Sequence, residues 1–118
     1  MKVYYAHCQN LYGTPQEKRD IDLLMSLGFT VENPSDQKHK DGCASLIDKM
    51  SYFCNLVHGC DALAFRCLPD GRIPAGVAAE IKQAQLEGKP VFELPTRILS
   101  RIITVEETRE FLMEIGQR

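Results

Sequence analysis

The sequence lacks several features that would place the chain in a special class of protein. It has no tryptophan, no cysteine pair in CxxC spacing, no low-complexity tract and no internal repeat. No apolar run approaches the ~20 residues that a membrane-spanning helix needs. The first ten residues, MKVYYAHCQN, have no apolar segment typical of a signal peptide. We therefore expect a cytoplasmic protein that is not bound to a membrane.

The chain also has little net charge. Its 14 basic and 16 acidic side chains leave a formal net charge of −2. Proteins that bind nucleic acid polymers need a basic surface, so we expect no such partner. A hydrophobic fraction of 44% over 118 residues suits one globular domain, and we expect residues 1–118 to form it.

Five cysteines are present, and their odd number together with the missing signal peptide indicates reduced thiols. Three of them lie near His58 in the sequence, but their spacing fits no common zinc template. We expect the cysteines to pack in the core as small apolar residues, and we expect neither a metal nor another cofactor. The five are Cys8, Cys43, Cys54, Cys60 and Cys67.

Short apolar runs alternate with helical patterns, which indicates an α/β fold with a doubly wound parallel sheet. Strands are expected at Lys2–Ala6, Phe29–Glu32, Asp61–Cys67 and Pro90–Leu94, with a short fifth at Arg101–Thr104. Helices are expected at Pro15–Leu27, Ala44–Val57, Ala75–Glu87 and Val105–Ile115, the last capped by Thr104. The polar segment 34–42 is expected to be a loop.

Local signals support the first two helices. Thr14 can cap the first helix, Pro15 suits its first position, and Glu17 completes a capping box. In the second helix, the apolar spacing predicts that Leu46 and Ile47 face inward together with Met50, Phe53, Cys54 and Val57.

A sheet of this kind binds ligands beyond the carboxyl ends of its strands, where the strand order reverses. We therefore expect functional residues in the loops that follow residues 6, 33, 67 and 94.

Glu80 is the first candidate, four residues after Gly76 where loop becomes helix. A glycine there lets the backbone approach a ligand closely, and a helix N-terminus favours an ionised carboxylate. Such a carboxylate in a cleft can act as the nucleophile toward C1′ of a sugar. The alternative is a solvent-facing glutamate that interacts only with the helix dipole.

Asp61 is a second acidic candidate, at the start of the third strand. An acid at this position is often a turn residue or a cap. Its position at the amino end of the strand also conflicts with a ligand at the carboxyl end.

Further polar residues lie at or just beyond the strand ends, and we take His7, Asn33, Arg66 and Gly76 as substrate-binding candidates. Arg66 could pair with a carboxylate or hold a phosphate. The alternatives are an ordinary loop histidine at His7 and a solvated side chain at Arg66. The basic cluster Lys38–Lys40 is expected to lie in a solvated loop.

Several short motifs follow one another along roughly residues 1 to 95. They are Tyr4–His7, Val31–Pro34, Cys60–Leu63, Ala75–Glu80 followed by Ala84, and Gly88–Val91. In this order they resemble the nucleoside 2-deoxyribosyltransferase-like superfamily, which includes deoxyribosyltransferases and nucleoside 5′-monophosphate N-glycosidases.

The resemblance implies a three-layer, flavodoxin-like sheet of four or five strands. It also implies cleavage or transfer at the N-glycosidic bond of a deoxynucleoside or deoxynucleoside 5′-monophosphate. By the same resemblance, Glu80 is the nucleophile, Asp61 holds or protonates the base, and Tyr5 orients the nucleophile, with Tyr4 possible. Members are commonly dimers or larger, so we expect a homo-oligomer whose site a second subunit completes.

Two other hypotheses stay open at this point. The same cleft could bind or sequester a nucleotide without cleaving it, because fold does not determine function. A flavodoxin-like electron carrier would need a first loop rich in Ser, Thr and Gly to hold phosphate. Residues 7–14 offer only Gly13 and Thr14 for that purpose, which disfavours the electron carrier.

Overall fold

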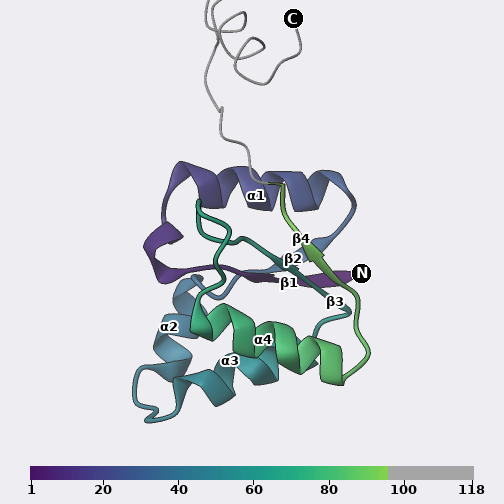
Figure 1. The fold of residues 1–118 in the computed structure, drawn as a ribbon. Helices are drawn as coiled ribbons and strands as arrows, with labels where there is room; N and C mark the ends of the chain where they lie inside the picture. Colours follow the sequence, from purple (N-terminus) through teal and green to yellow (C-terminus); the bar gives the residue numbers. More distant parts are fainter. Residues whose placement is uncertain (96–118) are drawn as a thin grey trace, which may run out of the picture.

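A four-stranded, all-parallel sheet forms the middle layer of the protein (Figure 1) in a computed structural model that describes residues 1–95. The strand order is β2-β1-β3-β4. The strands are β1 (Lys2–Ala6), β2 (Thr30–Glu32), β3 (Ala62–Phe65) and β4 (Val91–Glu93). The helices are the 3-10 helix η1 (Gln9–Leu11) and α1 (Pro15–Ser26), α2 (Gln37–Cys43), α3 (Lys49–His58) and α4 (Ala75–Leu86). The fold is thus α/β and flavodoxin-like, as predicted.

Helices cover both faces of this sheet, with α1 on one face and α3 and α4 on the other (Figure 1). The core on the α1 side contains Val3, Tyr5, Leu24, Ala62, Ala64 and Leu94. The core on the opposite side contains Tyr4, Ala6, Val57, Cys60, Leu63, Val77 and Ala84. Successive side chains of β1 therefore alternate between two buried cores, because side chains of a strand point to opposite faces in turn.

The first helix begins as the sequence predicts. Thr14 is the N-cap and its hydroxyl accepts a hydrogen bond from the backbone N–H of Glu17 at 3.3 Å. Pro15 occupies the first turn, and the chain leaves the helix through Gly28, whose φ of +93° favours glycine. The carboxylate of Glu17, however, does not bond to Thr14, and accepts instead from the backbone N–H of Gly13 at 3.1 Å.

Most of helix α2 (Gln37–Cys43) lies in the segment 34–42, which was predicted to be a loop. His39 of this helix is buried and its ring contacts two side chains, the carboxylate of Glu32 and the hydroxyl of Tyr52. These contacts join α2 to β2 and α3. The prediction was wrong because tertiary burial of one histidine stabilises a helix that local propensity does not favour.

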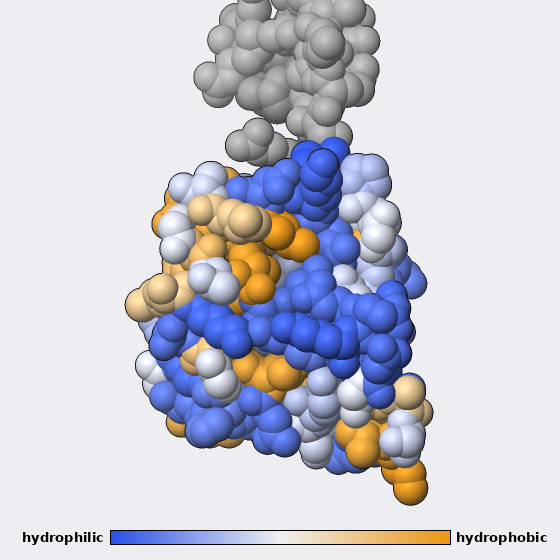
Figure 2. Space-filling view, turned by 180° about the vertical axis from the view of Figure 1, so that it is seen from behind, coloured by the Kyte–Doolittle hydropathy of each residue, from blue (hydrophilic) through white to orange (hydrophobic). Residues whose placement is uncertain are grey.

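Helix α3 begins at Lys49, five residues later than predicted. Asp48 caps it, because its carboxylate accepts from the backbone N–H of Ser51 at 3.1 Å. The connection before the cap protrudes from the molecule (Figure 1). In the reverse view an apolar area protrudes at the lower right, and further apolar areas lie near the middle and at the upper left (Figure 2). Leu46 and Ile47, predicted to face inward, are exposed in this connection.

The predicted strand Arg101–Thr104 and helix Val105–Ile115 lie outside the described residues. Among the residues described, no helix is long and apolar enough to cross a membrane, and no cluster of three or more His, Cys, Asp or Glu side chains could hold a metal. No disulfide joins any of the five cysteines, which all lie within the described residues. Burial raises the pKa of Cys60 to about 11, which fits a core residue with little reactivity.

Arg66, just after β3, is buried, and its guanidinium forms hydrogen bonds on the α1 side of the sheet. Its guanidinium donates to both carboxylate oxygens of Asp20 in α1 and, at 2.7 Å, to the backbone oxygen of Pro95. The hydroxyl of Tyr5 and the amide of Gln16 also donate to Asp20. Of the alternatives for Arg66, pairing with a carboxylate is therefore the one the structure adopts.

We expect Arg66→Ala to lower the free energy of unfolding by about 3 kcal/mol, because it leaves the buried carboxylate of Asp20 without its cation. Urea denaturation followed by circular dichroism would measure the change. Arg72→Ala is the matched control, because Arg72 pairs with Asp70 at the exposed surface and its loss should matter much less. Equal destabilisation by both variants would contradict a structural role for the Asp20–Arg66 pair.

Candidate functional site

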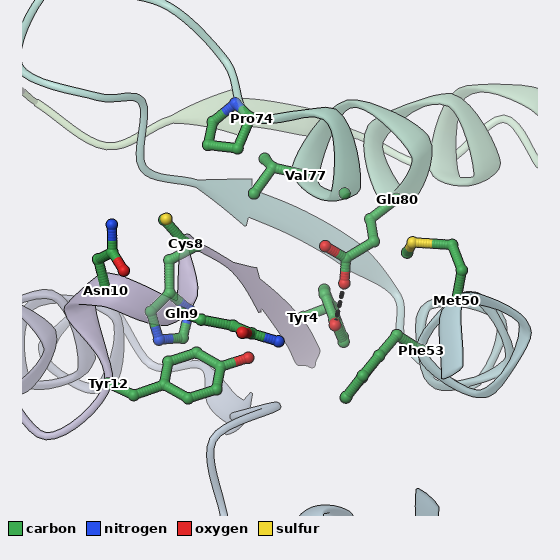
Figure 3. Close-up of a pocket in the computed structure, with 12 residues that line it drawn as sticks. Tyr4, Cys8, Gln9, Asn10, Tyr12, Met50, Phe53, Pro74, Val77 and Glu80 are labelled. Atoms are coloured by element: carbon green, nitrogen blue, oxygen red, sulfur yellow. Dashed lines mark hydrogen bonds between the residues drawn. The ribbon is translucent and has the colours of Figure 1, made fainter. Parts of the chain in front are cut away.

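A pocket of about 350 Å³ lies just beyond the carboxyl end of β1, the strand at which the sheet order reverses. Its walls come from the loop after β1, from α3 and from the start of α4 (Figure 3). The lining residues are Tyr4, His7, Cys8, Gln9, Asn10, Tyr12, Met50, Phe53, Pro74, Gly76, Val77 and Glu80. The pocket therefore lies where the topology predicts a ligand site, beside the loop after residue 6.

Glu80 forms one wall of the pocket and is only 6% exposed. The hydroxyl of Tyr4 donates a hydrogen bond to its carboxylate (Figure 3). Burial raises the pKa of Glu80 to about 7, although the bond from Tyr4 acts to lower it. Glu80 is therefore not the solvent-facing glutamate of the alternative interpretation, and both of its protonation states are populated at neutral pH.

Tyr4, and not Tyr5, is the tyrosine that meets Glu80. The two residues are neighbours on β1, so their side chains enter opposite cores, and Tyr5 donates instead to Asp20. Burial and the nearby charge of Glu80 both raise the pKa of Tyr4, which keeps its hydroxyl protonated as a donor. The preference for Tyr5 is thus corrected to Tyr4.

Aromatic and apolar side chains face the carboxylate from two sides of the pocket. Tyr12 comes from the loop after β1, and Met50 and Phe53 come from α3 (Figure 3). Burial raises the pKa of Tyr12 to about 12, so its ring is a neutral surface with one polar end. The sequence interpretation assigned Met50 and Phe53 to the core, because a helical apolar stripe does not reveal which members border a cavity.

Two more predicted residues lie at this pocket. Gly76, in the first turn of α4, lines it, and a Cβ built there would lie 3.9 Å from the sulfur of Met50. His7 also borders it, but both ring nitrogens are already engaged. Nδ1 lies 3.0 Å from the backbone oxygen of Tyr5, and Nε2 lies 2.7 Å from the carboxylate of Glu17.

The other predicted site residues do not line the pocket. Asp61 lies at the amino end of β3, where its carboxylate accepts from the backbone N–H of Lys2 at 2.7 Å. Asn33 follows β2, and its side-chain oxygen accepts from the backbone N–H of Ser35 at 3.0 Å. Like Arg66, both residues form hydrogen bonds within the fold. Asp61 lies at the amino end of its strand, as the sequence indicated, and so away from a ligand at the carboxyl end.

The raised pKa of Glu80 predicts a pH-dependent stability difference between the wild type and Glu80→Gln. The pKa in the folded state, about 7, exceeds the ordinary value of 4.5. The contribution of Glu80 to the free energy of unfolding is therefore most favourable below about pH 4.5 and is lost as the pH rises toward 7. Glutamine resembles the protonated form, so the variant should gain stability relative to wild type, by about 3 kcal/mol over that interval.

Urea denaturation at several pH values would measure this difference. Glu93→Gln is the control, because Glu93 is exposed on β4 and its substitution should give no comparable pH-dependent difference. A constant difference between Glu80→Gln and wild type from pH 4 to pH 8 would show that burial does not perturb Glu80.

Comparison with models of known protein families, with curated proteins and with solved structures found no match to this chain. The function must therefore be inferred from the pocket itself, above all from the buried Tyr4–Glu80 pair and the aromatic side chains beside it.

Proposed function

We propose that the protein cleaves or transfers at the N-glycosidic bond of a deoxynucleoside or deoxynucleoside 5′-monophosphate, with Glu80 as the nucleophile. The observation that carries this proposal is the buried carboxylate of Glu80, bonded to the hydroxyl of Tyr4 in the wall of a pocket. A volume of about 350 Å³ lies within the range of small-molecule sites, near its lower limit. The ordered motifs that resemble deoxyribosyltransferases give the proposal separate support.

In the proposed reaction, an ionised oxygen of Glu80 attacks C1′ of the sugar and the C1′–N bond breaks. Its electron pair leaves with the base, which takes up a proton from water. Water then attacks C1′ of the glycosyl ester, loses its proton to solvent and releases the sugar. If a second base attacks instead, a new N-glycosidic bond forms, and either route regenerates the carboxylate.

The surroundings of Glu80 suit these steps. The hydrogen bond from Tyr4 fixes one carboxylate oxygen and favours the ionised form, while burial removes water that would weaken the nucleophile. The rings of Tyr12 and Phe53 offer apolar faces on which a base can stack. The exposed amides of Gln9 and Asn10 add donors and acceptors at the rim.

The proposal includes a second copy of the chain and a cytoplasmic location. Leu46 and Ile47 are exposed just before α3, the helix that carries Met50 and Phe53 into the pocket. A second subunit that covered them would bury apolar surface beside the pocket. Five cysteines that form no disulfide with one another suit a reducing compartment.

The direct test is incubation with deoxynucleosides and their 5′-monophosphates, followed by chromatography for free base. We expect base release by the wild type and at least about a thousandfold loss for Glu80→Ala, because the covalent route is removed. Tyr4→Phe should lower kcat by about tenfold or more, because Glu80 loses its orienting donor. Glu93→Ala is the matched control with unchanged release. No release from any substrate, or equal release by Glu80→Ala, would overturn the proposal.

The pH dependence of kcat/KM tests the role of Glu80 separately. A nucleophile must be ionised, so kcat/KM should rise about tenfold per pH unit below pH 7 and level off above it. A fall in kcat/KM as the pH rises through 7 would indicate that the protonated carboxyl group acts as an acid instead.

A second candidate function is binding of a nucleotide without cleavage. It is favoured by the position of Asp61, since the acid that the resemblance assigns to the base lies outside the pocket. Thermal-shift measurements with nucleosides and nucleotides separate the two functions. A ligand that raises the melting temperature and is recovered intact supports binding alone, whereas one that is recovered as free base supports cleavage.

A further inference from the structure

The loop between β1 and α1 supplies one side of the pocket. Five of its residues line the pocket, namely His7, Cys8, Gln9, Asn10 and Tyr12. Its own backbone bonds are short-range, from Leu11 to Cys8 at 2.9 Å and from Tyr12 to Gln9 at 3.0 Å. Such local turns hold the shape of the loop, but they do not determine where it sits relative to Glu80.

Glu17, in the first turn of α1, connects this loop to the rest of the molecule. Its carboxylate accepts from the backbone N–H of Gly13 at 3.1 Å and pairs with Nε2 of His7 at 2.7 Å. Burial acts to raise the pKa of Glu17, but the hydrogen bonds from His7, Ser35 and Gly13 outweigh it and lower the pKa. One carboxylate thus joins the two ends of the loop, His7 and Gly13.

His7 extends this connection to the sheet and to the pocket wall. Its side chain is 0% exposed, and its ring stacks on Tyr5 with centroids 3.8 Å apart and planes 5° apart. The ring also contacts that of Tyr12, at a centroid distance of 5.0 Å. The position of Tyr12 therefore depends on the orientation of a histidine that is itself held at both nitrogens.

We propose that His7 and Glu17 are positioning residues, which hold the first loop so that Tyr12 and Gln9 face the substrate next to Glu80. Neither side chain contacts the substrate, because the ring of His7 is fully buried and Glu17 is directed to His7 and Gly13. The kinetic part of this inference rests on the proposed glycosidic activity, whereas the placement of the loop does not.

The hydrogen-bond chemistry of this pair provides a discriminating substitution. The backbone oxygen of Tyr5 can only accept, so Nδ1 of His7 carries a proton and donates to it. In Glu17→Gln, the amide oxygen can still accept from Gly13 and the amide nitrogen can donate to Nε2 of a neutral ring. In Glu17→Ala, both hydrogen bonds are lost. We call these two hydrogen bonds of Glu17, to His7 and Gly13, the tether of the loop. Glutamine should therefore preserve the tether, and alanine should not.

Amide hydrogen exchange in the full chain measures the tether without any substrate. We expect exchange in residues 9–13 to be about tenfold faster in Glu17→Ala, the effect of losing a hydrogen bond to a charged group. Glu17→Gln should stay within about threefold of wild type. Asp22→Ala removes an exposed acid from the same helix and is the matched control, with unchanged exchange.

Steady-state base release supplies a second readout, at a temperature where every variant is folded. Glu17→Ala should raise KM about tenfold with a smaller change in kcat, because Glu80 and Tyr4 stay in place while the substrate-facing loop moves. Glu17→Gln should restore KM to near the wild-type value. A general loss of stability would instead reduce the active fraction and leave KM unchanged.

The outcomes separate this inference from the proposed function. If the wild type releases no base, the proposed function fails, and the exchange data still decide whether Glu17 tethers the loop. Unchanged exchange in Glu17→Ala, or equal acceleration in Glu17→Gln and Glu17→Ala, would overturn the tether. Faster exchange in Glu17→Ala with rescue by Glu17→Gln supports it.

Discussion

Two consecutive tyrosines on the central strand impose the constraint on which the rest of the structure depends. β1 is buried on both faces, so Tyr4 and Tyr5 each bring a hydroxyl into a core where it needs a partner. Each finds a carboxylate from a helix, Glu80 of α4 on one face and Asp20 of α1 on the other. The same strand thereby orients the two helices that cover it.

The two pairs are chemically alike and differ in what surrounds them. Asp20 also accepts from Arg66 and Gln16, so its charge is compensated by a cation inside the core. Glu80 lies in the wall of a pocket, and its burial raises its pKa to about 7. A buried carboxylate that borders a cavity and titrates near neutral pH is typical of functional sites, whereas a compensated one contributes to stability.

The sequence predicted the parts of the fold that depend on short-range patterns. Runs of β-branched and aromatic residues predicted the strands. Thr14 and Pro15 predicted the start of α1, because a cap and an N1 proline act within one turn. Helix α2 was not predictable in this way, since it depends on contacts of His39 with Glu32 and Tyr52, elsewhere in the chain.

By itself, then, the sequence determined a doubly wound parallel sheet, four loops beyond the carboxyl ends of its strands as candidate positions for a ligand, and Glu80 as a candidate residue at that edge. These follow from periodicity and from the order of the elements along the chain. Only the tertiary structure decided that Tyr4 rather than Tyr5 meets Glu80. The alternation of a strand places the two tyrosines on opposite faces, but which face receives α4 depends on how the helices pack across the sheet. That packing involves residues 76 positions apart, beyond the reach of any local pattern.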